Sequence, residues 1–125
     1  MLMDYETLVE FAGAIISDAG LEVGKSIGRT QADYFTRNST VQRMTIRCEP
    51  KEEGVGRRRK EYLLTYLKYE LKNPPSEEDF NRFIEVSCRL IALGENTGCC
   101  HCSFHPEMSG TRCSCVLDMT WRWNK

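Results

Sequence analysis

Soft metal ligands crowd into one short segment near the carboxyl end of this chain. Five of its seven cysteines and both of its histidines lie between Cys99 and Cys115. Thiolate and imidazole are the donors that Zn²⁺ prefers, in tetrahedral sets of four, and a structural zinc can supply much of the folding free energy of a small domain. We therefore predict a structural Zn²⁺ site in this segment, without an open coordination position for catalysis.

The spacing of the donors allows two ligand sets. Cys102 and His105 have the two-residue gap of a zinc knuckle and would combine with Cys113 and Cys115. Alternatively, Cys100 and Cys102 would face Cys113 and Cys115 across a hairpin, because residues two apart on a strand point to the same side. Four of these five residues would bind the metal. The same hairpin would also allow disulfides from Cys100 to Cys115 and from Cys102 to Cys113.

The amino-terminal residues favour free thiols over disulfides. The segment Met1–Glu6 has neither the basic region nor the apolar region of a secretory signal, and the number of cysteines is odd. Clustered cysteines in a reducing compartment bind metal more often than they form bridges.

No apolar run approaches the roughly 18 residues of a membrane span. We expect an intracellular protein, cytoplasmic or nuclear, without a membrane partner.

Two amphipathic helices are predicted. The first begins after Asp4, a helix-capping residue, carries apolar residues at helical spacing, and stops at Gly20. The second begins after Ser76, with acidic residues in its first turn, and closes at Gly94. Cys88 lies on the apolar stripe of this second helix, so we expect it to be a small core residue.

Alternating side chains predict strands between and after the helices. Residues 42–48 alternate apolar and basic side chains, and residues 31–37 could pair with them. A turn is expected from Pro50 to Gly56. Residues 61–71 fit a helix or a strand, and their tyrosines and threonine favour a strand. Residues 116–123 predict a final strand. The fold class is therefore a single α+β domain, in which a body of residues 1–98 carries a Cys/His-rich hairpin of residues 99–125 packed on it.

Charge is distributed unevenly along the chain. The net charge is −1, but the segment from Lys25 to Lys72 holds twelve basic against six acidic residues, and the remainder holds five against twelve. A basic face of this kind can bind phosphate or an acidic partner, unless the two segments neutralise each other on folding. We predict a non-enzymatic, regulatory binding module that engages nucleic acid. Its predicted contacts are Arg43, Arg47, Arg57, Arg58, Arg59 and Lys60.

Enzyme motifs are weak in this sequence. Residues 19–26 match a relaxed phosphate-binding loop with alanine at the first glycine position, but they follow a predicted helix where such a loop needs a strand. His101-Cys102 begins like a phosphatase loop, yet Met108 stands where that chemistry requires an arginine. We therefore predict no catalytic residues.

A protein partner is the alternative. Trp121 and Trp123 share one face of the last strand, where burial is the favoured reading; if exposed, they would bind a partner together with the zinc hairpin. In general character a small cysteine-rich chain with a basic run resembles the regulatory accessory proteins of viruses. That resemblance covers no specific motif, so no residue role or activity is taken from it. The alternative function is a protein-interaction adaptor, or a viral accessory protein that antagonises a host factor, acting through the zinc hairpin and the two tryptophans. The oligomeric state is left open, and a homodimer is compatible with the sequence.

Overall fold

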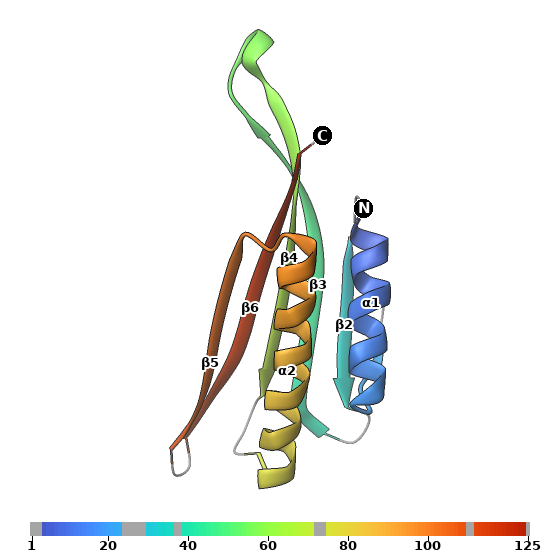
Figure 1. Ribbon diagram of the computed structural model, residues 1–125, viewed down its shortest axis with the longest axis vertical. Coiled ribbons are helices and arrows are strands. Elements are labelled where there is room, and N and C mark those ends of the chain that lie inside the picture. The colour runs from blue at the N-terminus through green and yellow to red at the C-terminus, as the bar shows by residue number, and fades with distance from the viewer. Residues whose placement is uncertain (1–3, 24–29, 37–38, 72–74, 110–111, 125) are drawn as a thin grey trace.

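The computed structural model describes residues 4–23, 30–36, 39–71, 75–109 and 112–124, which form two helices, one 3₁₀ turn and six strands (Figure 1). The elements in chain order are α1 (Tyr5–Asp18), β1 (Glu22–Val23), β2 (Gln31–Thr36), β3 (Ser39–Glu53), η1 (Gly56–Arg58), β4 (Lys60–Leu71), α2 (Glu77–Thr97), β5 (His101–Ser109) and β6 (Arg112–Asn124). Gly24, Lys25 and Ser26, from the weak match to a phosphate-binding loop, lie outside the described residues.

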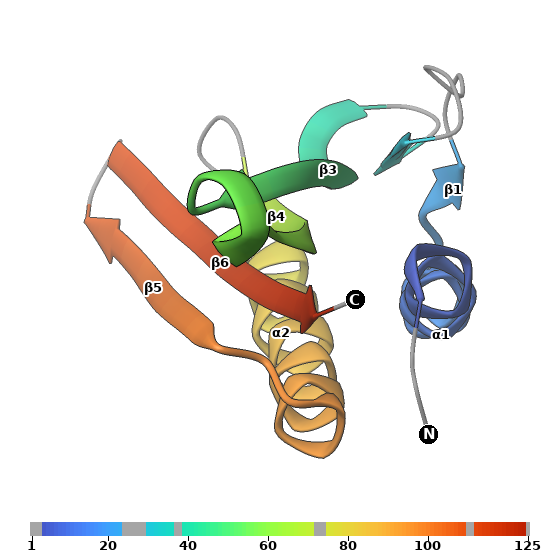
Figure 2. The ribbon, with the colours of Figure 1, turned by 90° about the horizontal axis from the view of Figure 1, so that it is seen from above.

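The strands form one antiparallel sheet in the order β1-β2-β3-β4-β6-β5. Both helices lie against the same face of this sheet (Figure 2). The opposite face, called the open face below, is not covered by any element among the described residues. The predicted α+β class and single domain are confirmed.

Both helices begin where the sequence predicts. The Asp4 carboxylate accepts a hydrogen bond from the Thr7 amide at 2.8 Å, and the Ser76 hydroxyl accepts one from the Asp79 amide at 3.1 Å. These bonds satisfy amides that have no partner within the first turn of a helix. The second helix is longer than predicted, because it continues through Gly94 to Thr97. Gly98 ends it in the left-handed conformation, with φ of 78°.

The strand predictions hold, but β3 is much longer than expected. Met44, Ile46 and Cys48 are buried, as the alternation predicts, and residues 61–71 lie in a strand. The sequence predicts a turn from Pro50, whereas β3 and β4 stay paired to Glu53 and Lys60. Proline is tolerated at position 50 because β3 has passed its last pair with β2 there, so that side of the strand is an edge.

The extension of β3 and β4 produces a projecting hairpin, which we call the arm and define as residues 51–61. Figure 1 shows it extending past the ends of both helices. Every residue of the arm is exposed. The arm therefore adds charged surface to the protein without adding to its core.

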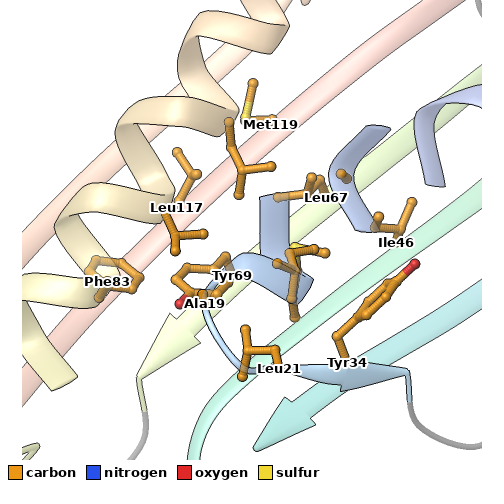
Figure 3. Close-up of a cluster of buried hydrophobic side chains, with 14 of the residues drawn as sticks. Ala19, Leu21, Tyr34, Ile46, Leu67, Tyr69, Phe83, Leu117 and Met119 are labelled. Carbon is orange, nitrogen blue, oxygen red and sulfur yellow. The ribbon is translucent and has the colours of Figure 1, made fainter. Parts of the chain in front are cut away.

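The core lies between the helices and the covered face of the sheet (Figure 3). Leu8, Ala12 and Ile16 of α1 and Phe83 and Leu90 of α2 are fully buried. The Phe83 ring stacks on the Tyr69 ring with a centroid distance of 4.9 Å, a contact worth about 0.5–1.5 kcal/mol beyond burial. Buried strand residues complete this layer; they include Ile46, Leu67, Leu117 and Met119.

The carboxyl-terminal hairpin is part of the sheet. Strand β6 pairs with β4 from Cys115 to Asn124 and with β5 on its other side. The predicted hairpin of residues 99–125 is thus joined to the body of residues 1–98 by strand pairing, and removing it would expose the β4 edge. No described helix is long and apolar enough to cross a bilayer.

Candidate nucleic-acid interface

The open face combines basic and aromatic side chains on its central strands. Alternation along β3 and β4 places core residues on the covered face and their neighbours on the open one. The basic side chains on the open face of β3, β4 and β6 are Arg43, Arg47, Lys51, Lys60, Lys68 and Arg122. Tyr62 and Tyr66 lie among them on β4, with Leu64 between the two rings.

Each of these tyrosines is paired with an arginine from a neighbouring strand. The Arg47 guanidinium carbon lies 4.6 Å from the centre of the Tyr66 ring. The corresponding distance from Arg122 to Tyr62 is 3.9 Å. Such cation–π contacts align a planar cation with an aromatic ring and are worth about 0.5–1 kcal/mol at exposed sites.

A hollow of about 430 Å³ lies beside Tyr66 on the open face. Arg43, Arg47 and Lys68 line it together with Glu70 and Asp118. Its volume falls within the roughly 300–1,000 Å³ of small-molecule sites, so it has room for a planar heterocycle. The lining mixes both signs of charge around one aromatic ring.

Carboxylates neutralise several of the open-face cations. Glu49 lies 3.5 Å from Arg47 and 3.4 Å from Lys51, and Glu53 lies 2.8 Å from Arg122. The hydrogen bond to Glu53 raises the pKa of Arg122, and the Arg122 hydrogen bond lowers the pKa of Glu53. Because these pairs are exposed, each contributes little to stability.

The arm carries the cations with the least neutralisation. Arg57 and Arg58 are exposed and form none of the ion pairs found among the described residues. Arg59 pairs with Glu52, and Lys60 lies opposite Glu53 across the arm. Unpaired cations on a projecting element can meet a phosphate without first losing an internal carboxylate.

The six predicted contact residues therefore occupy one β3–β4 hairpin. Arg43 and Arg47 lie on the open face of β3, and Arg57, Arg58, Arg59 and Lys60 lie in the arm. The sequence reasoning missed Tyr62, Tyr66 and Arg122. Alternation could have found the tyrosines, because residues that alternate with the buried Thr65 and Leu67 must face the other way.

The hairpin register separates the predicted zinc ligands. Cys102 lies opposite Met119, and Cys115 lies opposite Pro106, so the two cysteines are about 13 Å apart along the strands. His105 is on the open face, where its Nε2 lies 2.8 Å from the Ser103 hydroxyl, whereas Cys102 and Cys115 are on the covered one. The register that would align Cys100 with Cys115, expected from the spacing, is therefore not the one formed.

The residue types between the two strands account for this register. The last pair joins Ser109 to Arg112, and Gly110 lies between them, the residue type that two-residue turns favour. Aligning Cys100 with Cys115 would require the chain to reverse at Glu107 and Met108, which are poorer turn residues. The observed register therefore agrees with the turn preferences of the sequence and not with the spacing of the cysteines.

Three thiols remain close to the start of β5. The Cys99 thiol donates to the His101 carbonyl at 2.9 Å, and the Cys100 thiol donates to the Thr120 carbonyl at 3.2 Å. Burial raises the pKa of the nearby Cys102 thiol. The buried Cys115 belongs to the core.

No group of three or more potential metal ligands is arranged around a common point within the described residues. The side chain of Cys113, one of the predicted ligands, lies outside them. The zinc site therefore stays a prediction that rests on ligand chemistry.

That prediction can be measured by native mass spectrometry of the reduced protein. Ligand chemistry predicts one Zn²⁺ per chain, lost on chelation and on replacing Cys102 with serine, with Cys88→Ser as the control outside the cluster. A metal-free mass with all seven cysteines open to alkylation would contradict it.

The two tryptophans differ in exposure. Trp121 is fully buried, and its indole N–H donates to the Thr97 hydroxyl at 2.9 Å. Trp123 is half-buried, and its indole N–H donates to the Thr65 hydroxyl at 2.8 Å. Trp121 is buried, as the sequence analysis favoured. Of the two predicted partner contacts, only Trp123 is partly exposed to solvent.

No protein-family model matches this chain, and comparison with curated proteins and with solved structures finds no significant match.

Proposed function

We propose that this protein is a non-enzymatic binding module that engages nucleic acid through the β3–β4 hairpin. The exposed cations Arg57 and Arg58 on the projecting arm, which form none of the ion pairs found among the described residues, are the observation that carries the proposal. They would contact phosphates, and the open face would contact the rest of the ligand. The net charge of −1 does not oppose this, since phosphate contacts depend on the local arrangement of cations.

The location of the arm supports the same proposal. A two-stranded ribbon can enter a groove or lie along a backbone, and its exposed tip can approach a long polymer without a clash from the helices. Arg43, at the other end of the open face, also forms none of the described ion pairs. Cations at both ends of one surface suit an extended anionic ligand better than a compact one.

The test is the binding of a fluorescently labelled, mixed-sequence RNA or DNA, followed by anisotropy over a range of salt concentrations. The double variant Arg57→Gln/Arg58→Gln is expected to weaken binding about tenfold at low salt and to reduce the slope of log K against log salt by about 1.5. The reason is the loss of two phosphate contacts and of the counterions that they release.

A charge-matched control is available on the helical side. Arg82→Gln/Arg89→Gln removes the same charge from α2, where both arginines already pair with carboxylates. It is expected to bind like the unchanged protein. Equal weakening by both double variants, or binding that does not respond to salt, would count against a phosphate interface on the arm.

A further inference from the structure

We infer that the nucleic acid recognised by the open face is single-stranded, with unpaired bases stacked on Tyr62 and Tyr66. This inference rests on the proposed function and specifies its ligand class. It depends on four side chains of the open face: the two tyrosines of β4 and the two arginines that lie over their rings.

The first reason is the chemistry of the rings. Tyr62 and Tyr66 are half-buried on the open face and serve no described part of the core, whereas Tyr69 on the same strand is buried against Phe83. Aromatic side chains on a flat sheet stack unpaired bases, and such stacking tolerates any sequence because every base has an aromatic face. In a duplex the bases are already stacked on each other and cannot use these rings.

The second reason is the position of the guanidinium groups. Arg47 and Arg122 lie over Tyr66 and Tyr62 at 4.6 Å and 3.9 Å from the ring centres. An arginine at this position can stack on an incoming base or turn aside to meet the adjacent phosphate. Each ring therefore has a cation suited to the two parts of one nucleotide.

The third reason is the balance of charge. Glu49, Glu53 and Asp118 share the open face with its cations, so the face is only weakly positive and would attract a highly charged duplex poorly. A single strand has a lower charge density and gains affinity from stacking. The hollow beside Tyr66, between β3, β4 and β6, gives one base room next to the ring.

The test compares three probes of one mixed sequence: single-stranded RNA, single-stranded DNA and duplex DNA. Tyr62→Leu/Tyr66→Leu is expected to weaken binding of both single strands about tenfold or more. Tyr62→Phe/Tyr66→Phe, which keeps the rings, is expected to bind like the unchanged protein. The unchanged protein is expected to bind the duplex more weakly than either strand, and circular dichroism checks that both variants are folded.

A second measurement needs no substitution. A single strand carrying 5-bromouracil is crosslinked to the unchanged protein by ultraviolet light, and tryptic peptides are mapped. Cleavage after Lys60 and Lys68 releases both tyrosines in one peptide, residues 61–68. The adduct is expected on that peptide, and an adduct confined to peptides of α1 or α2 would overturn the inference.

The outcomes separate the two proposals. If no probe binds, the proposed function fails and the inference fails with it. If binding depends on Arg57 and Arg58 but is unchanged by Tyr62→Leu/Tyr66→Leu, or if the duplex binds as tightly as the single strands, the proposed function stands and the inference alone is overturned. If RNA and DNA single strands bind with different affinities and both depend on the tyrosines, the inference is supported, and the tighter ligand shows which sugar the site prefers.

Discussion

Replacing Trp121 with alanine is expected to lower the free energy of unfolding by about 3–5 kcal/mol, the range for removing a large aromatic side chain from a packed core. Trp121 is fully buried, and its indole N–H bonds to Thr97, the last residue of α2. The Thr97 hydroxyl in turn donates to the Leu93 carbonyl at 2.6 Å. The side chain therefore both fills the core and fixes the end of α2 on β6.

Two related substitutions separate these contributions. Trp121→Phe keeps much of the ring but removes the N–H, and is expected to cost less than Trp121→Ala. Trp123→Ala removes the same side chain two residues later, where it is half-buried, and is also expected to cost less. Urea denaturation followed by circular dichroism gives all three free energies. If Trp123→Ala proved as costly as Trp121→Ala, the assignment of Trp121 to the core would be wrong.

The elements of the fold could be predicted where local chemistry decides them. Asp4 and Ser76 each bond an amide of the first helical turn, which is an interaction within three residues. Met44, Ile46 and Cys48 are buried while Arg43 and Arg47 are exposed, as strand alternation requires. In both cases the sequence pattern and the structure depend on the same short-range geometry.

The predictions that failed depend on contacts between distant segments. Cys88 lies on the apolar stripe predicted for α2 but is exposed, because the helix turns the small residues Ser87 and Gly94 towards the sheet. Because Ser87 is polar, the apolar pattern of the sequence does not show that this side of the helix is buried. Likewise, the pairing of Cys102 with Met119 depends on where the hairpin reverses, and spacing between cysteines does not carry that information.

The candidate interface was half predictable for a similar reason. The run of basic residues from Arg57 to Lys60 is visible in the sequence. Its projection from the body is not, because it depends on β3 continuing through Pro50, where the sequence predicts a turn. Arg122 joins Tyr62 only because β6 lies next to β4 in the sheet. A surface assembled from three strands is a property of topology, so its members cannot be collected from one stretch of sequence.

Gly94→Val is expected to lower the free energy of unfolding by about 1–3 kcal/mol, the usual cost of overpacking a core. The sequence suggests that Gly94 ends α2, but the residue is buried inside the helix and lies next to Met119 of β6. A Cβ atom there would collide with the Met119 methyl group and lie 3.1 Å from the Cys99 Cβ. Met119 is itself buried, so it has little room to move.

A second helical glycine provides the matched comparison. A Cβ atom at Gly13 in α1 would be 3.4 Å from the nearest atom, the Tyr34 hydroxyl, which is ordinary contact. Gly13→Ala is therefore expected to raise the free energy of unfolding by about 0.5–1 kcal/mol through helix propensity alone. If urea denaturation shows a lower free energy of unfolding for Gly94→Val and a higher one for Gly13→Ala, close packing of α2 on β6 would be established. A stabilised Gly94→Val would instead mean that the helix ends before position 94, as its sequence suggests.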